Sequence, residues 1–460
     1  METICAISTA PGMGAIALIR LSGNKSISIA DSIFRNPSGR SIAALKGGQI
    51  IYGNIFLPSD DTIIDEVVIS LFRAPHSFTG EDTVEIACHG STHIQRRILQ
   101  LLIDSGARLA RPGEFSKRAF LNGKMDLSQT EAVADLIASK NEAARRIAMQ
   151  QMKGSLSTRL KELRSKIVEF SSLLELELDF SDQDVEFADR SQLRLLLSET
   201  DNYVLHLARS FSLGDAIKNG IPVAIIGLPN AGKSTLLNRL LGEDRAIVSD
   251  IPGTTRDSIE ETIHMGDVEL RLIDTAGIRH TTDTIESIGI ERALNRATKA
   301  MVILLLVDVN SSQNDINSLS SILKNHINKE QQHILLVINK IDTNTTHQTD
   351  LSSLPCDEKV CISALDGQGM EQLQEALVRI TMTREADNED IIITNARHYE
   401  ALIRAHEALT RVQQGIEANI SGEFISLDIH DATDALAEIT GEISSQEILN
   451  NIFSKFCIGK

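Results

Sequence analysis

A regular alternation of apolar runs and helical patterns between residues 221 and 381 constrains the fold of this chain more than any other sequence feature. Each apolar run precedes a loop and then residues with helical periodicity. Parallel strands need long crossover connections and are buried on both faces, so they appear as nearly continuous apolar segments. The alternation therefore predicts a mostly parallel α/β sheet with helices on both faces. Its expected strands cover residues 221–226, 270–273, 301–307 and 334–338.

The segment between the first apolar run and a helical pattern at 234–241 matches a phosphate-binding loop. Residues 227–234 are Gly-Leu-Pro-Asn-Ala-Gly-Lys-Ser, which fits G-x-x-x-x-G-K-[ST]. Glycines let backbone amides converge on phosphate oxygens, and the helix N-terminus adds a partial positive charge. We expect Lys233 to reach the β- and γ-phosphates of a nucleotide and Ser234 to ligate Mg²⁺.

Three further motifs follow later strands in the order of a guanine-nucleotide site. Asp274 ends the second apolar run and is expected near the magnesium ion, with the Gly277 amide near the γ-phosphate. The Asp342 carboxylate can accept hydrogen bonds from N1–H and N2–H₂ of guanine. Such a site is expected to favour guanine over adenine by a factor of ~10⁴. The motifs are Asp274-Thr275-Ala276-Gly277, Asn339-Lys340-Ile341-Asp342 and Ser363-Ala364-Leu365. In the last of these, a backbone amide is expected to donate a hydrogen bond to guanine O6.

Residues 249–257 are expected to form the first switch, with Thr255 sensing Mg²⁺ and the γ-phosphate. Position 278 holds isoleucine, where small signalling GTPases place a glutamine that orients the attacking water. Isoleucine cannot do this, so a partner or an unusual internal device must complete catalysis. The expected GTP contacts are Asn230, Ala231, Gly232, Lys233, Ser234, Thr235, Ser249, Asp250, Ile251, Pro252, Gly253, Thr254, Thr255, Asp274, Thr275, Ala276, Gly277, Asn339, Lys340, Asp342, Ser363, Ala364 and Leu365.

The flanks of this region indicate a multidomain chain. Before residue 120, short apolar runs alternate with Gly and Pro turn signals, which is typical of a small α+β domain. Helical periodicity begins at Leu127 and returns after about residue 383. We expect the P-loop domain to be inserted into one all-α helical domain, with two separate helical domains as the alternative. The expected boundaries are 1–122 for the α+β domain, 123–218 and 384–460 for the helical domain, and 219–383 for the P-loop domain.

Helix starts and packing faces are also readable in the helical segments. Residues 128–131 and 444–447 have the form of capping boxes, Ser-x-x-Glu. A seam of apolar residues with spacings of four and three predicts a long helix that ends in an acidic stretch at 175–189, expected to be a solvated loop. The seam consists of Leu156, Leu160, Leu163, Ile167, Phe170 and Leu174.

Composition limits the partners and the location of the chain. A formal net charge of −18 argues against nucleic-acid binding through one large basic face and assigns any RNA contact to a local patch or a partner protein. The five cysteines form no Cys-x-x-Cys pair, which favours reduced thiols in the cytoplasm. The N-terminus lacks a signal-peptide pattern, and the apolar run at 300–307 is shorter than the ~20 residues that span a bilayer, so no membrane association is expected.

Several motifs together resemble the MnmE (TrmE) family of bacterial tRNA-modification GTPases, and the resemblance covers essentially the whole chain. The residues that carry it are Asn230 in the phosphate loop, Gly-Thr-Thr-Arg-Asp at 253–257, Asp-Thr-Ala-Gly-Ile-Arg at 274–279, Phe-Cys-Ile-Gly-Lys at 456–460, Ser-Phe-Thr-Gly-Glu-Asp at 77–82 and Arg-Pro-Gly-Glu-Phe-Ser at 111–116.

The resemblance implies an answer to the missing glutamine. Members of this family are activated by K⁺ when two G domains meet face to face. Asn230 would offer its side-chain oxygen to K⁺, with backbone carbonyls of Ser249, Ile251 and Thr254 completing the cage. Glu286 resembles the family's catalytic acid, which positions the water, and would act beside Lys233 and Thr255. Ser234 and Thr255 would ligate Mg²⁺.

The resemblance also implies a folate site in the N-terminal domain. Arg20, Glu85 and Lys124 match the family's folate-contacting positions, and the terminal Lys460 would reach in from the helical domain. The ligand would be 5-formyl- or 5,10-methylenetetrahydrofolate. Cys457 would lie near this pocket as a possible reactive thiol, and an inert thiol at the end of a helix is the alternative. The final Lys460 fits poorly with a prenylation signal.

The function implied by the resemblance is modification of tRNA at C5 of the wobble uridine, U34. The chain would act as a homodimer that joins an FAD-dependent partner of the MnmG/GidA type in a heterotetramer, with FAD only on the partner. A folate one-carbon unit, with glycine or ammonium as the amine, would yield (carboxymethyl)aminomethyluridine. A ribosome-assembly GTPase and a non-catalytic GTP-gated scaffold are the alternatives, although the acidic helical flanks lack the basic RNA-binding domain usual in the former.

Overall fold

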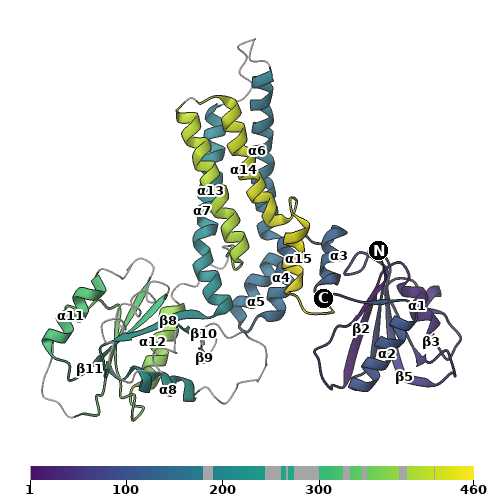
Figure 1. Cartoon of the computed structure of the whole chain (residues 1–460), viewed down its shortest axis with the longest axis horizontal. Helices are drawn as coiled ribbons and strands as arrows, with labels where there is room; N and C mark the ends of the chain where they lie inside the picture. Colours follow the sequence, from purple (N-terminus) through teal and green to yellow (C-terminus); the bar gives the residue numbers. More distant parts are fainter. Residues whose placement is uncertain are drawn as a thin grey trace. The chain divides into compact units, whose positions relative to one another are not determined.

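The computed structural model describes residues 2–179, 190–243, 261–265, 268–273, 300–324, 332–343, 350–382, 391–418 and 420–459. The chain divides into two compact units. The first comprises Met1–Ala138, Ala148–Val204 and Ala401–Lys460, and the second Ser139–Ile147 and Leu205–Glu400. Figure 1 labels the elements of both. Within the described residues, no helix is long and apolar enough to cross a membrane.

The N-terminal part of the first unit is a seven-stranded sheet in the order β3-β4-β5-β6-β2-β1-β7. Neighbouring strands are antiparallel except β1 and β7. The elements are β1 (Ile4–Ile7), β2 (Ile16–Ser22), α1 (Ser26–Ser32), β3 (Phe34–Arg35), the 3₁₀ helix η1 (Ile42–Ala44), β4 (Gln49–Phe56), β5 (Ile63–Phe72), β6 (Thr83–His89), α2 (Thr92–Asp104) and β7 (Arg108–Leu109).

One face of this sheet carries the core of the domain. Alternate strand residues such as Ile19 and Ile69 pack with Ile98 and Leu102 of α2, and all four are fully buried. Such alternation is the pattern of a sheet packed on one side only. The α+β prediction for this part of the chain is therefore confirmed.

Helices from both ends of the sequence pack together in the first unit. They are α3 (Glu114–Leu121), α4 (Leu127–Ala138), α6 (Ser155–Asp179), α14 (Gly422–Thr440) and α15 (Gln446–Ser454). α6 packs along α14 (Figure 1). Four residues of the predicted seam, from Leu156 to Ile167, are buried, whereas the acidic stretch from residue 180 to 189 lies outside the described residues. Leu127 forms a small core with Leu449 and Phe453 of α15. The predicted insertion follows, because these helices precede and follow the second sheet in the sequence.

Both predicted capping boxes are misplaced. α4 begins at Leu127, so Ser128 lies inside the helix. Asp126 is the actual cap. Its Oδ1 accepts a hydrogen bond from the backbone N–H of Gln129 at 3.0 Å, and Gln129 Oε1 accepts one from the backbone N–H of Asp126 at 2.9 Å. The second cap is Ser445, whose Oγ accepts from the Ile448 amide at 3.2 Å. Serine can occupy a cap or the first turn, so the pattern alone did not fix the register.

The second unit contains a six-stranded sheet in the order β13-β12-β11-β8-β10-β9, with only β9 antiparallel to its neighbour. The elements are β8 (Ile221–Gly227), α8 (Lys233–Glu243), β9 (Glu261–Met265), β10 (Val268–Leu272), β11 (Val302–Asp308), α11 (Gln313–Lys324), β12 (His333–Asn339), β13 (Glu358–Cys361) and α12 (Met370–Met382). Three further helices, α5 (Glu142–Met152), α7 (Arg190–Asn219) and α13 (Ala396–Glu417), run through both units.

Helices cover both faces of this sheet. Residues of α8 and α12, such as Leu236 and Leu373, pack on one face with Leu304. Residues of α11, such as Ile316, pack on the other face with Leu305. The predicted parallel sheet is thus confirmed. β9 was not predicted because it is a short edge strand in which only alternate residues are apolar.

A glycine inside α7 allows another segment to approach closely. A Cβ added at Gly214 would lie 2.0 Å from the carbonyl oxygen of Ile393. We predict that Gly214→Ala lowers stability by about 1–3 kcal/mol despite the higher helix propensity of alanine, because the 391–395 segment must shift. The measurement is calorimetric unfolding of the full chain.

Gly242→Ala in α8 is the matched control, since nothing lies within 4 Å of its added Cβ. It is expected to leave the unfolding midpoint unchanged or to raise it slightly. A Gly214→Ala midpoint at or above that of the unchanged chain would contradict the packing described.

Candidate functional sites

The phosphate-binding loop joins β8 to α8 with a strained backbone. Asn230 has φ of +59° and Gly232 has φ of +97°. A Cβ added at Gly232 would lie 2.2 Å from Asn339 Nδ2, so only glycine fits there. Left-handed residues in such a loop turn successive amides toward one side, where they form an anion-binding concavity.

The polar side chains of this loop are placed for phosphate and cation binding. Lys233 Nζ donates to the carbonyl oxygens of Gly227 at 2.9 Å and Leu228 at 2.8 Å. Burial lowers the pKa of Lys233. Ser234 and Thr235 are exposed in the first turn of α8, where the helix dipole favours negative ligands. Ala231 is buried beneath the loop.

Asn339 connects the phosphate-binding loop with the 363–365 loop. Its side chain is 2% exposed, its Nδ2 donates to the Ala231 carbonyl at 2.8 Å, and its Oδ1 accepts from the Ala364 amide at 2.9 Å. One buried amide thereby holds the two loops expected to meet phosphate and base. The sequence predicted Asn339 as a GTP contact; this bridging role depends on the order of β12, β11 and β8.

The remaining guanine-site residues lie at the same edge of the sheet. Lys340 forms an ion pair with Asp308 at 2.7 Å, and Asp342 is exposed. Burial alone would raise the pKa of Asp308, but hydrogen bonds from Lys340 and Asn310 lower it. Sequence reasoning missed Asp308, although its position at the end of β11 was a usable signal.

Arg239 of α8 supports the 363–365 loop from below. It donates to the carbonyl oxygens of Ala364 at 3.2 Å and Leu365 at 2.6 Å. Ser363 is fully buried, and its Oγ accepts from the Asp366 amide at 3.1 Å. The Leu365 side chain is 71% exposed. The structure therefore fixes the backbone of this loop and leaves its outer surface accessible.

Several predicted site residues lie outside the described residues. They are Ser249, Asp250, Ile251, Pro252, Gly253, Thr254 and Thr255 of the switch, Asp274, Thr275, Ala276 and Gly277, the candidate acid Glu286, and Lys460. The completed cation cage and the water-positioning acid therefore stay predictions.

In the N-terminal domain, Arg20 and Glu85 face each other across β2 and β6. Arg20 Nε donates to Glu85 Oε1 at 2.8 Å, and the two side chains are 17% and 19% exposed. The Arg20 guanidinium lies 5.3 Å from the ring centre of Phe78 and 5.7 Å from that of Phe115. Two predicted folate contacts thus form one partly buried ion pair between aromatic rings.

The C-terminal segment packs beside this pair. The Gly459 carbonyl oxygen accepts a hydrogen bond from Ser8 Oγ at 3.1 Å. A Cβ added at Gly459 would lie 2.3 Å from the Ile7 carbonyl oxygen. β1, which contains Ile7, is the direct neighbour of β2. The Cys457 side chain is exposed. Lys124 Nζ donates to the Pro75 carbonyl at 3.0 Å, on the loop that leads to Phe78.

A buried arginine holds α3 against the same domain. Arg118 is 3% exposed and forms ion pairs with Glu81 at 2.8 Å and Glu114 at 3.2 Å. Burial alone would raise the pKa of Glu114, but hydrogen bonds from Arg108, the Arg111 amide and Arg118 lower it to about 2. This network was not predicted, since its members come from segments that only the fold brings together.

The parallel sheet, the strained phosphate-binding loop and the Asn339 bridge define a P-loop protein of the guanine-nucleotide-binding class. A family model described as the MnmE helical domain matches residues 127–457, and one described as the N-terminus of the GTP-binding protein TrmE matches residues 3–124. The chain belongs to the MnmE family of tRNA modification GTPases.

Relatives named tRNA modification GTPase MnmE match this chain from end to end. The protein from Parabacteroides distasonis is 50% identical over all of both chains. That from Flavobacterium psychrophilum is 46% identical over all of this chain and 99% of its own. Among solved structures, Aquifex aeolicus Era bound to GDP and AlF₄⁻ is 29% identical over 41% of this chain and 66% of that chain, with a TM-score of 0.26. That score is too low to bear on the whole chain.

We predict that Asn339→Ala weakens guanine-nucleotide binding by about tenfold or more. The change leaves the Ala231 carbonyl and the Ala364 amide without their buried partner, which costs roughly 1–3 kcal/mol. Titration with a fluorescent guanine nucleotide measures the effect. Asn314→Ala is the control, because Asn314 is exposed on α11 and belongs to none of the loops of the nucleotide site. Equal affinities of Asn339→Ala and the unchanged chain would contradict the bridging role.

Proposed function

We propose that this chain is a K⁺-activated, G-domain-dimerising GTPase that modifies C5 of the wobble uridine of tRNA together with an FAD-dependent partner. The observation that carries the nucleotide part is the Asn339 bridge between the phosphate-binding loop and the 363–365 loop. A site in which phosphate and base loops share one buried amide is organised for a whole guanine nucleotide rather than for phosphate alone.

The residues of the P-loop unit have distinct roles in this proposal. Lys233 exchanges its two carbonyl acceptors for phosphate oxygens. The exposed Ser234 hydroxyl, with Thr255, would hold Mg²⁺, which would supply positive charge against the phosphates. Asp342, exposed beyond β12, accepts from the guanine edge. Selectivity then comes from the carboxylate, because adenine offers no donors to it.

Catalysis depends on a cation and an acid. Asn230 is exposed in a left-handed conformation. In this proposal its side-chain oxygen would hold K⁺ together with the backbone carbonyls of Ser249, Ile251 and Thr254. Glu286 holds the attacking water in place of the glutamine that is absent at position 278. A second G domain then closes the site from outside.

Dimerisation of the N-terminal domain is supported by an open, apolar sheet face. Ile16, Ile50 and Tyr52 are 68%, 68% and 51% exposed. Tyr52 lies opposite Val68 on the neighbouring strand. Ile50, Glu85 and Arg20 lie at the same level of the sheet, in a row that crosses β4, β5, β6 and β2. Exposed apolar side chains that gather on one sheet face mark an interaction surface. We propose that a second copy covers it and thereby borders the folate site.

The folate part of the proposal rests on the Arg20–Glu85 pair. A carboxylate suits the paired donors of a pterin ring, a guanidinium suits the carboxylates of its glutamate tail, and the partly buried Phe78 offers a flat apolar wall, while the fully buried Phe115 supports Arg20 from the core. The bound 5-formyl- or 5,10-methylenetetrahydrofolate would supply the one-carbon unit. Lys124, Lys460 and Cys457 border the site in this proposal.

The cation mechanism is tested by GTP turnover of the full chain in KCl and in NaCl. We predict a rate at least about tenfold higher in KCl, since the cation takes the place of an arginine finger. Glu286→Ala is expected to abolish turnover while GTP affinity stays within about twofold. Glu371→Ala, which changes an exposed glutamate in the first turn of α12, serves as the control. Equal rates in both salts would remove K⁺ from the mechanism.

Calorimetric titration with 5-formyltetrahydrofolate tests the N-terminal site. We predict that Arg20→Ala weakens binding by about tenfold or more, because a charge-assisted hydrogen bond is lost and Glu85 is left unpaired. Arg35→Ala is the control, since Arg35 pairs with Asp61 on the surface of the same domain. A chain that binds no folate would favour the ribosome-assembly or scaffold alternatives.

A further inference from the structure

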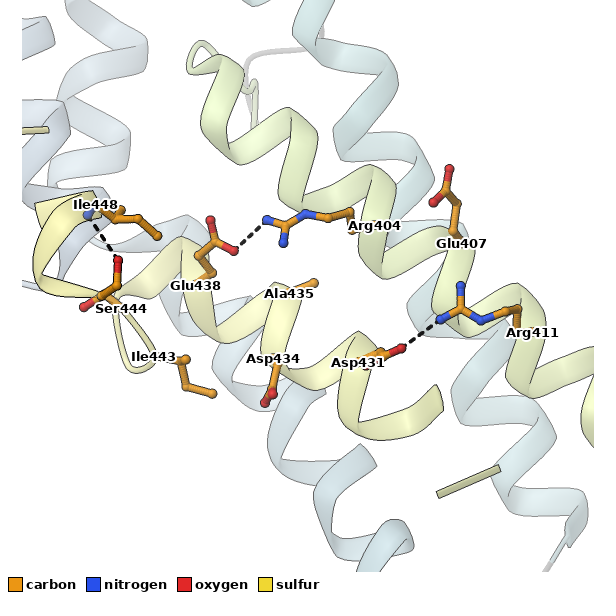
Figure 2. A pocket seen from close by; sticks show the side chains of 11 residues that line it. Arg404, Glu407, Arg411, Asp431, Asp434, Ala435, Glu438, Ile443, Ser444 and Ile448 are labelled. Carbon is orange, nitrogen blue, oxygen red and sulfur yellow. Dashed lines mark hydrogen bonds and ion pairs between the residues drawn. The ribbon is translucent and has the colours of Figure 1, made fainter. Parts of the chain in front are cut away.

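A charged hollow lies between α13, α14 and the turn before α15, and the residues that line it all belong to the first compact unit. Its volume is about 400 Å³. Arg404, Glu407 and Arg411 border it on α13, Asp434 borders it on α14, and Ile443 and Ile448 line its far end (Figure 2). None of these residues belongs to the nucleotide or folate sites described above.

The arginines of the hollow are hydrogen-bonded to acids, whereas two of the acids that line it accept no hydrogen bond. Arg404 pairs with Glu438 at 2.6 Å, and Arg411 pairs with Asp428 at 2.6 Å and with Asp431 at 3.0 Å. Within the described part of the chain, Glu407 and Asp434 form no hydrogen bond or ion pair, and Figure 2 shows both without a dashed line. Four carboxylates line the hollow against two guanidinium groups, so it carries an excess of negative charge.

An exposed apolar surface continues this hollow along α14. Phe424 and Leu427 are 63% and 62% exposed. Positions 424, 427, 431, 434 and 438 are spaced by three and four residues, which places them on one side of the helix. At 1.5 Å per residue, this stripe extends over roughly 20 Å. One half of it is aromatic and aliphatic, and the other half is acidic.

We propose that this surface, defined as the α14 stripe from Phe424 to Glu438 together with the hollow, is a docking site for a basic amphipathic helix of a partner protein. The acidic half fits lysine or arginine side chains, and the apolar half fits their neighbours at helical spacing. Nucleic acid and anionic membrane surfaces are repelled by the unpaired carboxylates. A second copy of a chain with a net charge of −18 is a poor match for the same reason.

The two halves of the docking site contribute differently to binding. The arginines of the hollow are hydrogen-bonded to Glu438, Asp428 and Asp431. Glu407 is attracted to Arg411 without a hydrogen bond, so Glu407 and Asp434 both keep their carboxylate oxygens available for the partner. Exposed charges of this kind accelerate association and make it sensitive to salt. Burial of Phe424 and Leu427 removes apolar area from water and slows dissociation.

The test uses the full chain and the FAD-dependent partner protein from the same bacterium, so the choice of probe rests on the proposed function. In the double variant Glu407→Gln with Asp434→Asn, we expect association about fivefold or more slower at ~50 mM salt, with a smaller difference at ~300 mM. In Phe424→Ser with Leu427→Ser, we expect dissociation about tenfold faster. GTP turnover of the chain alone should stay unchanged in both.

The matched control is Glu169→Gln with Glu199→Gln, which removes the same charge from exposed positions on α6 and α7. It is expected to bind the partner as the unchanged chain does. If the unchanged chain binds and both docking-site variants bind equally well, the docking proposal is overturned and the proposed function is not. If the unchanged chain does not bind the flavoprotein, both fail. A shift in self-association of the docking-site variants would identify a second copy as the occupant and overturn the proposal.

Discussion

The two hydrogen bonds of Asn339 are the interaction on which the organisation of the nucleotide site depends. Parallel strands end at the same edge of their sheet, so β8 and β12 deliver the phosphate-binding loop and the guanine motif to neighbouring positions. Proximity alone would leave two loops free to move separately. The buried amide of Asn339 fixes the distance between them, and the absence of a side chain at Gly232 makes room for it. Removal of either feature would disturb phosphate and base recognition together.

The fold and the nucleotide-binding motifs of the second compact unit could be predicted from the sequence. Its strands are buried on both faces, and its loops need particular residues to bind a nucleotide. The phosphate-binding loop needs glycine, lysine and serine at fixed spacing, and those residues stand where the structure places the loop. Partners that only tertiary contact brings together were not predictable in this way. Asp308 beside Lys340 and the Arg118 network are examples. The predicted helix caps were misplaced by one or two residues, because the actual caps, Asp126 and Ser445, lie close to other serines that could also cap the helix.

In the N-terminal domain, by contrast, the sequence patterns gave little information on the candidate site, and the structure explains its arrangement. A lone arginine and a lone glutamate carry no signal in a sequence, and the family resemblance alone singled out Arg20 and Glu85. The sheet explains why they belong together, since register pairs them across β2 and β6 and the aromatic rings of Phe78 and Phe115 shield them from water. An ion pair that is four-fifths buried is costly to keep unless it is well bonded or serves a ligand. The C-terminal segment at Gly459 lies against β1, the strand next to β2.

We propose that this GTPase serves modification of the wobble uridine in tRNA. Nucleoside analysis of tRNA tests it most directly, in a strain that lacks the gene and in the same strain supplied with the unchanged chain or with Lys233→Ala. We expect C5-aminomethyl-type uridines to disappear in the deletion strain, to return with the unchanged chain, and to stay absent with the variant that cannot hold the phosphates. Wobble uridines that remain fully modified in the deletion strain would contradict it.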